Sequence, residues 1–457
     1  MSHPGPALER RLGTLDGALL TVGAVVGTGI FLTGGEVARA AGSPAAVLLV
    51  WIAGGLLSLA GALTYAELGA MMPRAGGLYA YLASAYGPLW GFFYGWACLL
   101  VIMTGGIAAI AVGFGEYLGS FLPAFASGHP VLSITLGGWR FRPDGAQVAG
   151  ALAILILTGV NHLGVRAGAA AQNVLTALKL AAAAAFVVLG FAAAAPASRA
   201  PLPAIAAASG GRSPAGFALG MIAALWTYDG WYALTFSAGE LRDPGRTLPR
   251  GLIAGTLTVT LLYVAMNAVF LRALPFDVLA HSARSAEDAA AALFGARGAR
   301  MLSAAVVLAS FGCLASTILY SSRIYQPMAE DGVFFRSVAA VDPRFHVPVR
   351  SLWLQSLWAV VLALSGSYVQ LFTWVTFAAV LFHVACGASV FVLRARRPEL
   401  PRPYRVWGYP VVPAGFILGM AVLLASTLVQ RPIESLLGLG CVAAGWPAYA
   451  WWRRGRA

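Results

Sequence analysis

Two apolar stretches of the 457-residue sequence are interrupted by glycine and polar residues where lipid would be expected. The first interruption is residues 23–31, Gly-Ala-Val-Val-Gly-Thr-Gly-Ile-Phe, and the second is residues 226–231, Trp-Thr-Tyr-Asp-Gly-Trp. Each lies in a run long enough to cross a bilayer, where unpaired backbone N–H and C=O groups are costly. Something polar must therefore meet the opened backbone, as a solute does between the discontinuous helices of secondary transporters.

The first interruption offers groups of both charges. Gly27 and Gly29 allow the backbone to leave helical geometry and approach a ligand closely, and Thr28 adds a hydroxyl. The half-helix that follows would direct unpaired N–H groups at a carboxylate, while the carbonyl groups near Val25 would suit an ammonium. Together these groups would fit an α-amino acid. The alternative is that the glycines only allow neighbouring helices to pack tightly.

The second interruption places the carboxylate of Asp229 beside a glycine and between aromatic residues. An ionisable residue inside a membrane span is a functional hypothesis by default. Trp226 could cover a bound substrate, with Thr227 next to it. Asp229 could contact the substrate directly, or it could accept hydrogen bonds from N–H groups freed where the helix restarts. The sequence leaves both roles open.

Lys179 is the only lysine among thirty basic residues, and it lies in an apolar run. Its ammonium is a compact charge with three donors, whereas arginine carries a planar fork, so this exception indicates a geometric requirement. A charge inside the bilayer costs roughly 2.5 to 3.5 kcal/mol on insertion scales, and the ammonium should therefore face carbonyls or hydroxyls within the protein. The alternative is that the side chain extends to the membrane surface.

Four other polar residues give weaker signals. Glu67 and Glu116 lie near span ends and are expected at the membrane interface more than as proton carriers. His383 and Arg323 could relay protons or pair with carboxylates, but a structural role is favoured for both. The sequence lacks a phosphate-binding loop, His-Glu-x-x-His and Gly-x-Ser-x-Gly, so we expect no enzyme, no ATP-driven pump, no metal site and no cofactor.

Composition indicates a membrane protein that crosses the bilayer many times. Hydrophobic residues make up 59% of the chain and charged residues 10%, whereas about 25% charged is usual in soluble domains. Apolar runs of about 20 residues predict transmembrane helices. The twelve predicted spans are residues 16–40, 44–72, 88–120, 146–165, 171–195, 214–239, 250–272, 301–330, 351–366, 369–394, 409–429 and 433–452.

The basic residues predict the orientation. With both termini in the cytoplasm, eighteen of the thirty lie on the inner side, nine lie on the outer side and three lie within spans, as the positive-inside rule requires. We expect the cell membrane, in a bacterium the inner membrane. The net charge of +13 then needs no nucleic-acid partner, because it is spread over helix ends. All four cysteines fall inside spans, so no disulfide is expected.

The chain is predicted to be one all-α membrane domain, residues 1–457. A cytoplasmic N-terminus (1–15) precedes a first repeat (16–195), a second repeat (214–394) and two further helices (409–452). Each repeat begins with a broken helix. Because an odd number of spans separates the two broken helices, the second repeat is inverted in the membrane relative to the first. A polar stretch at residues 280–295 is predicted to form a short outer helix, as a lid or a solvated loop.

Several motifs resemble the amino acid-polyamine-organocation superfamily, in particular L-type amino acid transporters and bacterial serine/threonine-exchanger-like permeases. The resemblance covers nearly the whole chain. It rests on residues 23–31, 65–69 (Tyr-Ala-Glu-Leu-Gly), 73–79 (Pro-Arg-Ala-Gly-Gly-Leu-Tyr), 176–180 (Thr-Ala-Leu-Lys-Leu), 228–231, 240–244 (Glu-Leu-Arg-Asp-Pro), 248–250 (Leu-Pro-Arg), 321–323 (Ser-Ser-Arg) and 403–410 (Pro-Tyr-Arg-Val-Trp-Gly-Tyr-Pro).

This resemblance implies a leucine-transporter-type fold of two inverted five-helix repeats and a role for each interruption. The substrate carboxylate would meet the backbone around Gly27, Thr28 and Gly29. The α-amine would meet carbonyls near Val25 and Trp226, and the Trp226 ring would close the site.

The resemblance also implies that Lys179 stands where sodium-coupled members hold a sodium ion. Its ammonium would bridge the opened first helix to the eighth, near Cys313, Ser316 and Thr317, so transport should not depend on sodium. Animal light chains carry a cysteine between the third and fourth helices that links them to a heavy chain. Residues 119–145 contain no cysteine, so no covalent partner is expected.

The expected function is exchange of neutral L-amino acids by alternating access. One alternative is proton-coupled symport that could extend to cationic amino acids, with Lys179, Glu67 or Glu116 as the titrating group. An alternative of another class is an amino-acid sensor in the membrane that binds without transport. The motifs do not identify the preferred side chain.

Overall fold

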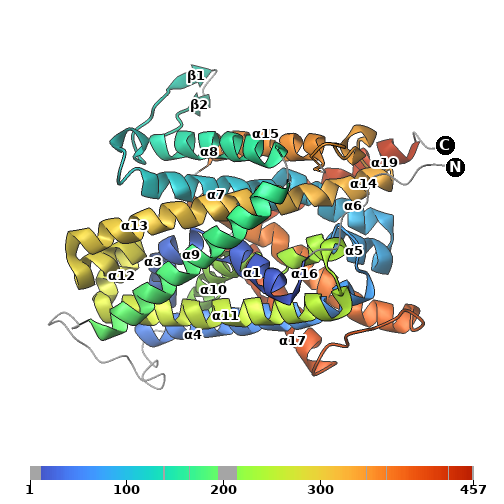
Figure 1. Cartoon of the computed structure of the whole chain (residues 1–457), viewed down its shortest axis with the longest axis horizontal. Helices are drawn as coiled ribbons and strands as arrows, with labels where there is room; N and C mark the ends of the chain where they lie inside the picture. The colour runs from blue at the N-terminus through green and yellow to red at the C-terminus, as the bar shows by residue number, and fades with distance from the viewer. Residues whose placement is uncertain are drawn as a thin grey trace.

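The computed structural model describes residues 12–136, 139–163, 165–193, 214–345, 347–366, 368–430 and 432–454. Most of the predicted N-terminal segment 1–15 therefore lies outside the described residues. Helices account for most of what is described, and they lie side by side in one bundle (Figure 1).

The bundle places its broken helices in the interior. Helices α4 and α11 run along one side, α7, α8 and α15 run along the other, and α1 and α10 lie between them (Figure 1). The elements in chain order are α1 (Thr14–Val25), α2 (Gly29–Leu32), α3 (Gly34–Ala41), α4 (Pro44–Met71), α5 (Leu78–Tyr86), α6 (Pro88–Ala97), η1 (Cys98–Ile102), α7 (Met103–Leu118), η2 (Pro123–Phe125), β1 (Ile134–Leu136), β2 (Trp139–Phe141), α8 (Gly145–His162), α9 (Val165–Ala192), α10 (Pro214–Tyr228), η4 (Ala233–Glu240), α11 (Pro244–Ala273), α12 (Phe276–His281), α13 (Ser285–Ser321), η5 (Ser322–Ile324), α14 (Tyr325–Glu330), η6 (Arg336–Ala339), α15 (Val349–Ser365), α16 (Tyr368–Arg396), α17 (Val411–Gln430), α18 (Pro432–Ala443) and α19 (Gly445–Arg454).

Each of the twelve predicted spans contains a helix. Within the described ranges, nine helical stretches are long and apolar enough to cross a membrane. The other three predicted spans hold shorter pieces: α10 with η4, the 17-residue α15, and α18 with α19. The chain is thus a multi-pass helical protein, while the count of twelve spans stays a prediction.

Three local features differ from the simplest expectation. Residues 134–136 and 139–141 pair as two short antiparallel strands, β1 and β2, and both are rich in β-branched and aromatic residues, which favour strands. Helix α5 lies in a stretch between the predicted spans. The predicted outer helix at 280–295 is divided between α12 and the start of α13, which bends at Gly295 with φ of +69°.

Both interrupted helices end inside the predicted segments. The first helix stops at Val25, and α2 restarts at Gly29. Helix α10 stops at Tyr228, the chain turns through Gly230 with φ of +99°, and η4 begins at Ala233. Glycine is favoured at such a positive φ because it has no Cβ.

Candidate functional site

The two helix breaks lie against each other. A Cβ on Gly230 would lie 3.0 Å from the carbonyl oxygen of Ala24, and a Cβ on Gly29 would lie 3.1 Å from the Cα of Thr227. The backbones therefore touch where both helices open, and a larger residue at Gly230 would meet the main chain of the first break.

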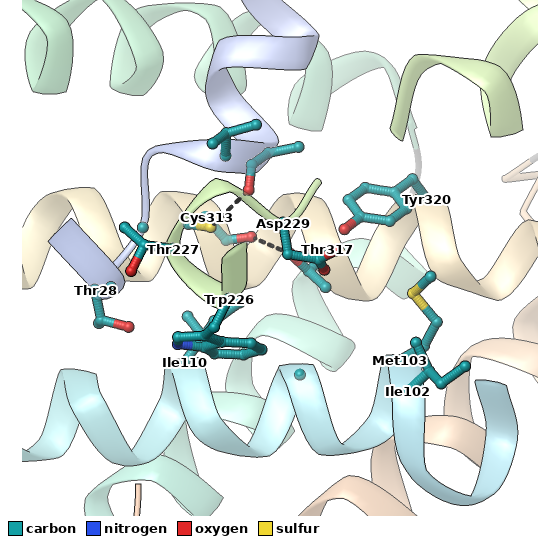
Figure 2. A pocket seen from close by; sticks show the side chains of 15 residues that line it. Thr28, Ile102, Met103, Ile110, Trp226, Thr227, Asp229, Cys313, Thr317 and Tyr320 are labelled. Carbon is teal, nitrogen blue, oxygen red and sulfur yellow. Dashed lines mark hydrogen bonds between the residues drawn. The ribbon is translucent and has the colours of Figure 1, made fainter. Parts of the chain in front are cut away.

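A cavity of about 470 Å³ lies beside these breaks, between α1, α2, α7, α10 and α13. All seven residues predicted to bind substrate line it. In the view of Figure 2, Thr28 and Tyr320 lie at opposite ends, with Trp226 and Asp229 between them. The lining residues are Ala24, Val25, Gly27, Thr28, Gly29, Ile102, Met103, Gly106, Ile110, Trp226, Thr227, Asp229, Cys313, Thr317 and Tyr320.

The first break presents free donors to this cavity. The Thr28 hydroxyl is buried and has no hydrogen-bond partner among the described residues. The backbone N–H groups of Thr28 and Gly29 likewise find no acceptor within the described part of the chain. The Val25 carbonyl, by contrast, accepts from the hydroxyl of Tyr263 (3.0 Å) and from the Gly27 N–H (2.9 Å). This end of the site is thus better prepared for an anion than for a cation.

The second break is held by side chains from other helices. The Trp226 indole N–H donates to the Tyr368 hydroxyl on α16 at 3.0 Å, and only 7% of Trp226 is exposed. The Thr227 hydroxyl lies 2.7 Å from the Thr33 hydroxyl and donates to the Ala223 carbonyl (3.0 Å). The ring of Trp226 is therefore fixed across the cavity, and Thr227 ties α10 to the first helix.

Asp229 lies between two cavities. It lines the first, and it also lines a second of about 310 Å³ that is walled by α10, α16 and α17. Its carboxylate lies close to the Gly230 N–H and the Tyr232 hydroxyl. Both roles therefore stay predictions, because the same carboxylate lies beside the freed backbone and borders the cavity.

Lys179 is buried, and its ammonium points at the opened first helix. The Nζ atom donates to the carbonyl oxygens of Gly23 (2.6 Å) and Val26 (2.7 Å). Only 4% of the residue is exposed, so the side chain does not extend to the protein surface. The lysine thereby satisfies two carbonyls that the helix break leaves without helical donors.

Helix α13 supplies the groups predicted to lie opposite Lys179. The Cys313 thiol donates to the Ala24 carbonyl at 3.4 Å and so joins α13 to the first helix. The Thr317 hydroxyl donates to the Cys313 carbonyl (2.9 Å), and the Ser316 hydroxyl to the Gly312 carbonyl (2.8 Å). Cys313 and Thr317 line the cavity, whereas Ser316 does not. The two hydrogen bonds of the Lys179 ammonium thus reach the first helix and not these three residues.

Sequence reasoning missed the apolar wall of the cavity. That wall comes from η1 and α7, where a π-helical turn, a feature frequent at functional sites, precedes Met103. It also missed Tyr263 and Tyr368, which bond to the two breaks, and Tyr320. The one sequence feature that could have indicated this wall is the pair of adjacent glycines, 105 and 106, within an apolar span. The missed lining residues are Ile102, Met103, Gly106, Ile110 and Tyr320.

The weaker polar candidates lie elsewhere in the structure. Glu67 is buried and pairs with Arg394 at 2.6 Å near the ends of α4 and α16, and its position at the membrane interface stays a prediction. His383 binds the Tyr65 hydroxyl at 2.9 Å within an aromatic cluster. Arg323 pairs with a carboxylate. These three residues hold helices together and do not line the first cavity.

The chain resembles known proteins over nearly its whole length. A family model described as amino acid permease matches residues 12–436. The serine/threonine exchanger SteT of Bacillus subtilis (strain 168) is 31% identical over 445 residues, covering 97% of this chain and 96% of the relative. The large neutral amino acids transporter small subunit 2 of Oryctolagus cuniculus is 30% identical over 454 residues, covering 97% and 81%. The b(0,+)-type amino acid transporter 1 of Mus musculus is 29% identical over 434 residues, covering 94% and 84%.

The match over nearly the full length confirms the resemblance seen in the motifs. The relatives are transporters of amino acids, and the described helices include many that are apolar enough to cross a membrane. The chain belongs to the amino acid permease family, and it is a multi-pass membrane protein of this transporter family.

Proposed function

We propose that the protein exchanges neutral L-amino acids across the membrane by alternating access, without sodium. The observation that supports this most directly is the ammonium of Lys179, which binds the Gly23 and Val26 carbonyls at the opened first helix. A fixed cation at these oxygens supplies the charge that sodium supplies in sodium-coupled members of the fold. The relatives named as an exchanger and as a transporter of large neutral amino acids favour the same function.

The proposed binding mode uses the free groups of the first break. The substrate carboxylate accepts from the N–H groups of Thr28 and Gly29 and from the Thr28 hydroxyl, a helix-start geometry that suits anions. The α-amine meets the carbonyl groups around Val25 and Trp226, and the Trp226 ring covers the substrate. The side chain then faces the apolar α7 wall, which favours neutral substrates because it offers a charge no partner.

The membrane arrangement belongs to the same proposal. Residues 16–195 and 214–394 form inverted repeats, residues 409–452 add two helices, and both termini face the cytoplasm, in a bacterial cell at the inner membrane. The protein works without a covalently linked heavy chain, because residues 119–145 contain no cysteine.

Uptake into proteoliposomes tests this function. Vesicles with the purified full-length protein are loaded with unlabelled serine, unlabelled leucine or buffer alone, and entry of labelled serine is measured in sodium or choline chloride. We expect internal amino acid to accelerate entry, and choline to leave the rate unchanged. Equal entry into empty vesicles would remove exchange, and a requirement for sodium would remove the proposed role of Lys179. Binding without any flux would indicate a sensor.

A second candidate is proton-coupled symport that also accepts cationic amino acids, and Asp229 favours it because its carboxylate faces the cavity. Competition by lysine against labelled serine, with and without an imposed pH gradient, tests this candidate. If Asp229 recognises a cationic side chain, Asp229→Asn should remove competition by lysine and keep competition by leucine. A pH gradient that drives no accumulation would eliminate proton coupling.

A further inference from the structure

A groove of about 840 Å³ lies away from the substrate cavity, between the end of α4, helix α5 and the end of α16. Arg74 and Arg397 line it and are exposed, while Leu393 is buried and Met72 and Leu400 are half-buried. The groove therefore combines two cationic side chains with an apolar surface.

The two arginines are not neutralised by the protein. In the described part of the chain, neither side chain makes a hydrogen bond or an ion pair. The neighbouring arginines differ, since Arg394 and Arg402 lie 2.6 Å and 3.6 Å from the carboxylate oxygens of Glu67. The Glu67 carboxylate is therefore already paired with Arg394 and Arg402. Arg74 and Arg397 both present positive charge to the groove. An anion is its natural complement.

The position of the groove matches the surface of a bilayer. Arg74 follows the end of α4 and Arg397 follows the end of α16, on the side that the arginine distribution predicts to be cytoplasmic. In the loop after α16, Trp407 is 79% exposed, and Tyr409 carries the Arg394 guanidinium 3.7 Å from its ring centre. Exposed tryptophan and tyrosine beside arginine are typical of the membrane–water interface.

We propose that this groove binds the headgroup of an anionic phospholipid of the phosphatidylglycerol class. The phosphate would accept hydrogen bonds from Arg74 and Arg397, and the glycerol and first acyl carbons would pack on Met72, Leu393 and Leu400. Basic pockets between transmembrane helices on the cytoplasmic side bind other anionic lipid headgroups, those of cardiolipin and phosphoinositides. A free phosphate would use the arginines but would leave the apolar part of the groove uncovered. The bound lipid would join α5 to α16.

Thermal unfolding of the full-length protein in an uncharged detergent tests this site. Phosphatidylglycerol, phosphatidylethanolamine and inorganic phosphate are titrated separately, and the rise in Tm gives an apparent Kd. The test variant is Arg74→Gln/Arg397→Gln. The matched control is Arg396→Gln, which removes an exposed arginine next to Arg397 that does not line the groove.

We expect phosphatidylglycerol to raise the Tm of the wild type and of Arg396→Gln equally, and the double variant to bind at least about fivefold more weakly. Equal weakening by Arg396→Gln would indicate non-specific surface attraction and overturn the proposal, as would a wild type whose Tm does not respond to phosphatidylglycerol. Inorganic phosphate acting as well as the lipid would assign the groove to a soluble anion instead. If the double variant does not fold, Arg397→Gln alone decides between the same outcomes.

Discussion

Arg323 and Glu240 form a buried ion pair, with 2.8 Å between the Nε and Oε1 atoms and with 5% and 15% of their side chains exposed. The pair joins η5, which follows α13, to the end of η4, which follows the second helix break. One helical turn nearer the cavity, Phe236 stacks on Tyr320 with the rings 4° from parallel. These two contacts close the bundle beyond the Tyr320 end of the cavity.

Replacing Glu240 with glutamine should destabilise this closed arrangement. Removing one partner of a buried ion pair costs about 3 to 5 kcal/mol, because the other charge stays buried. We expect a clearly lower Tm in detergent and faster alkylation of Cys313, the cysteine that lines the cavity. Asp243→Asn is the control, since its pair with Arg246 is 3.9 Å long and mostly exposed. Equal Tm values for Glu240→Gln and the wild type would show that the pair does not hold the bundle closed.

Lys179→Arg should abolish transport while the protein still folds. The ammonium donates two short bonds to carbonyls on the first helix, at 2.6 and 2.7 Å, and a planar guanidinium cannot occupy the same point. Losing such charge-assisted bonds, each worth about 1.5 to 3 kcal/mol, should lower exchange at least tenfold. Uptake into proteoliposomes measures the effect, and a monodisperse gel-filtration peak verifies folding. A variant with normal flux would contradict the proposed role of the lysine.

The positions where the helices open could be predicted from the sequence, because glycine and polar residues clustered within an apolar run are unexpected in a continuous helix that lies in lipid. Gly27, Thr28, Gly29 and Asp229 stood out for this reason, and all four line the cavity. The single lysine stood out because the rest of the chain uses arginine.

The sequence could not show which distant side chains complete the site. Tyr263 and Tyr368 are ordinary aromatic residues in apolar helices until the fold brings them to Val25 and Trp226. The partners of Glu67 are equally remote, since Arg394 lies 327 positions along the chain. Its place near a span end suggested the interface but could not reveal the tertiary contacts that bury its side chain in the protein.

Glu67→Gln should weaken the connection between α4 and α16. The Glu67 carboxylate receives two hydrogen bonds from Arg394 (2.8 and 2.6 Å) and one from the Val406 N–H (2.6 Å), and 2% of the side chain is exposed. An amide keeps the shape but leaves the guanidinium without its counter-charge, at a cost of about 3 kcal/mol. Thermal unfolding measures the loss.

The control for this substitution is Glu36→Gln. Glu36 pairs with Arg39 at a similar distance, 2.9 Å, but the two side chains are 35% and 53% exposed. Exposed pairs contribute less than about 1 kcal/mol, so its Tm should stay near that of the wild type. Similar Tm losses in both variants would mean that burial of Glu67 does not increase the contribution of its ion pair to stability.

Gly106→Ala should narrow substrate selection without reducing stability. Gly106 lines the cavity, and a Cβ there would meet no described atom within 4 Å. The new methyl group therefore projects into space that we assign to the substrate side chain. Alanine also favours the helix over glycine by about 1 kcal/mol. One methylene in an apolar pocket changes discrimination by about 1 to 3 kcal/mol, so the KM for leucine should rise about tenfold or more while the KM for serine changes little.

Gly159→Ala separates this steric effect from the general gain in helix stability. Gly159 lies on α8, outside the cavity lining, and a Cβ there would also meet no described atom within 4 Å. Both variants should therefore unfold at or above the wild-type Tm, but only Gly106→Ala should change the ratio of the leucine and serine KM values. An unchanged ratio in Gly106→Ala would place the substrate side chain away from α7, toward the second cavity behind Trp226, because that space also borders the helix breaks.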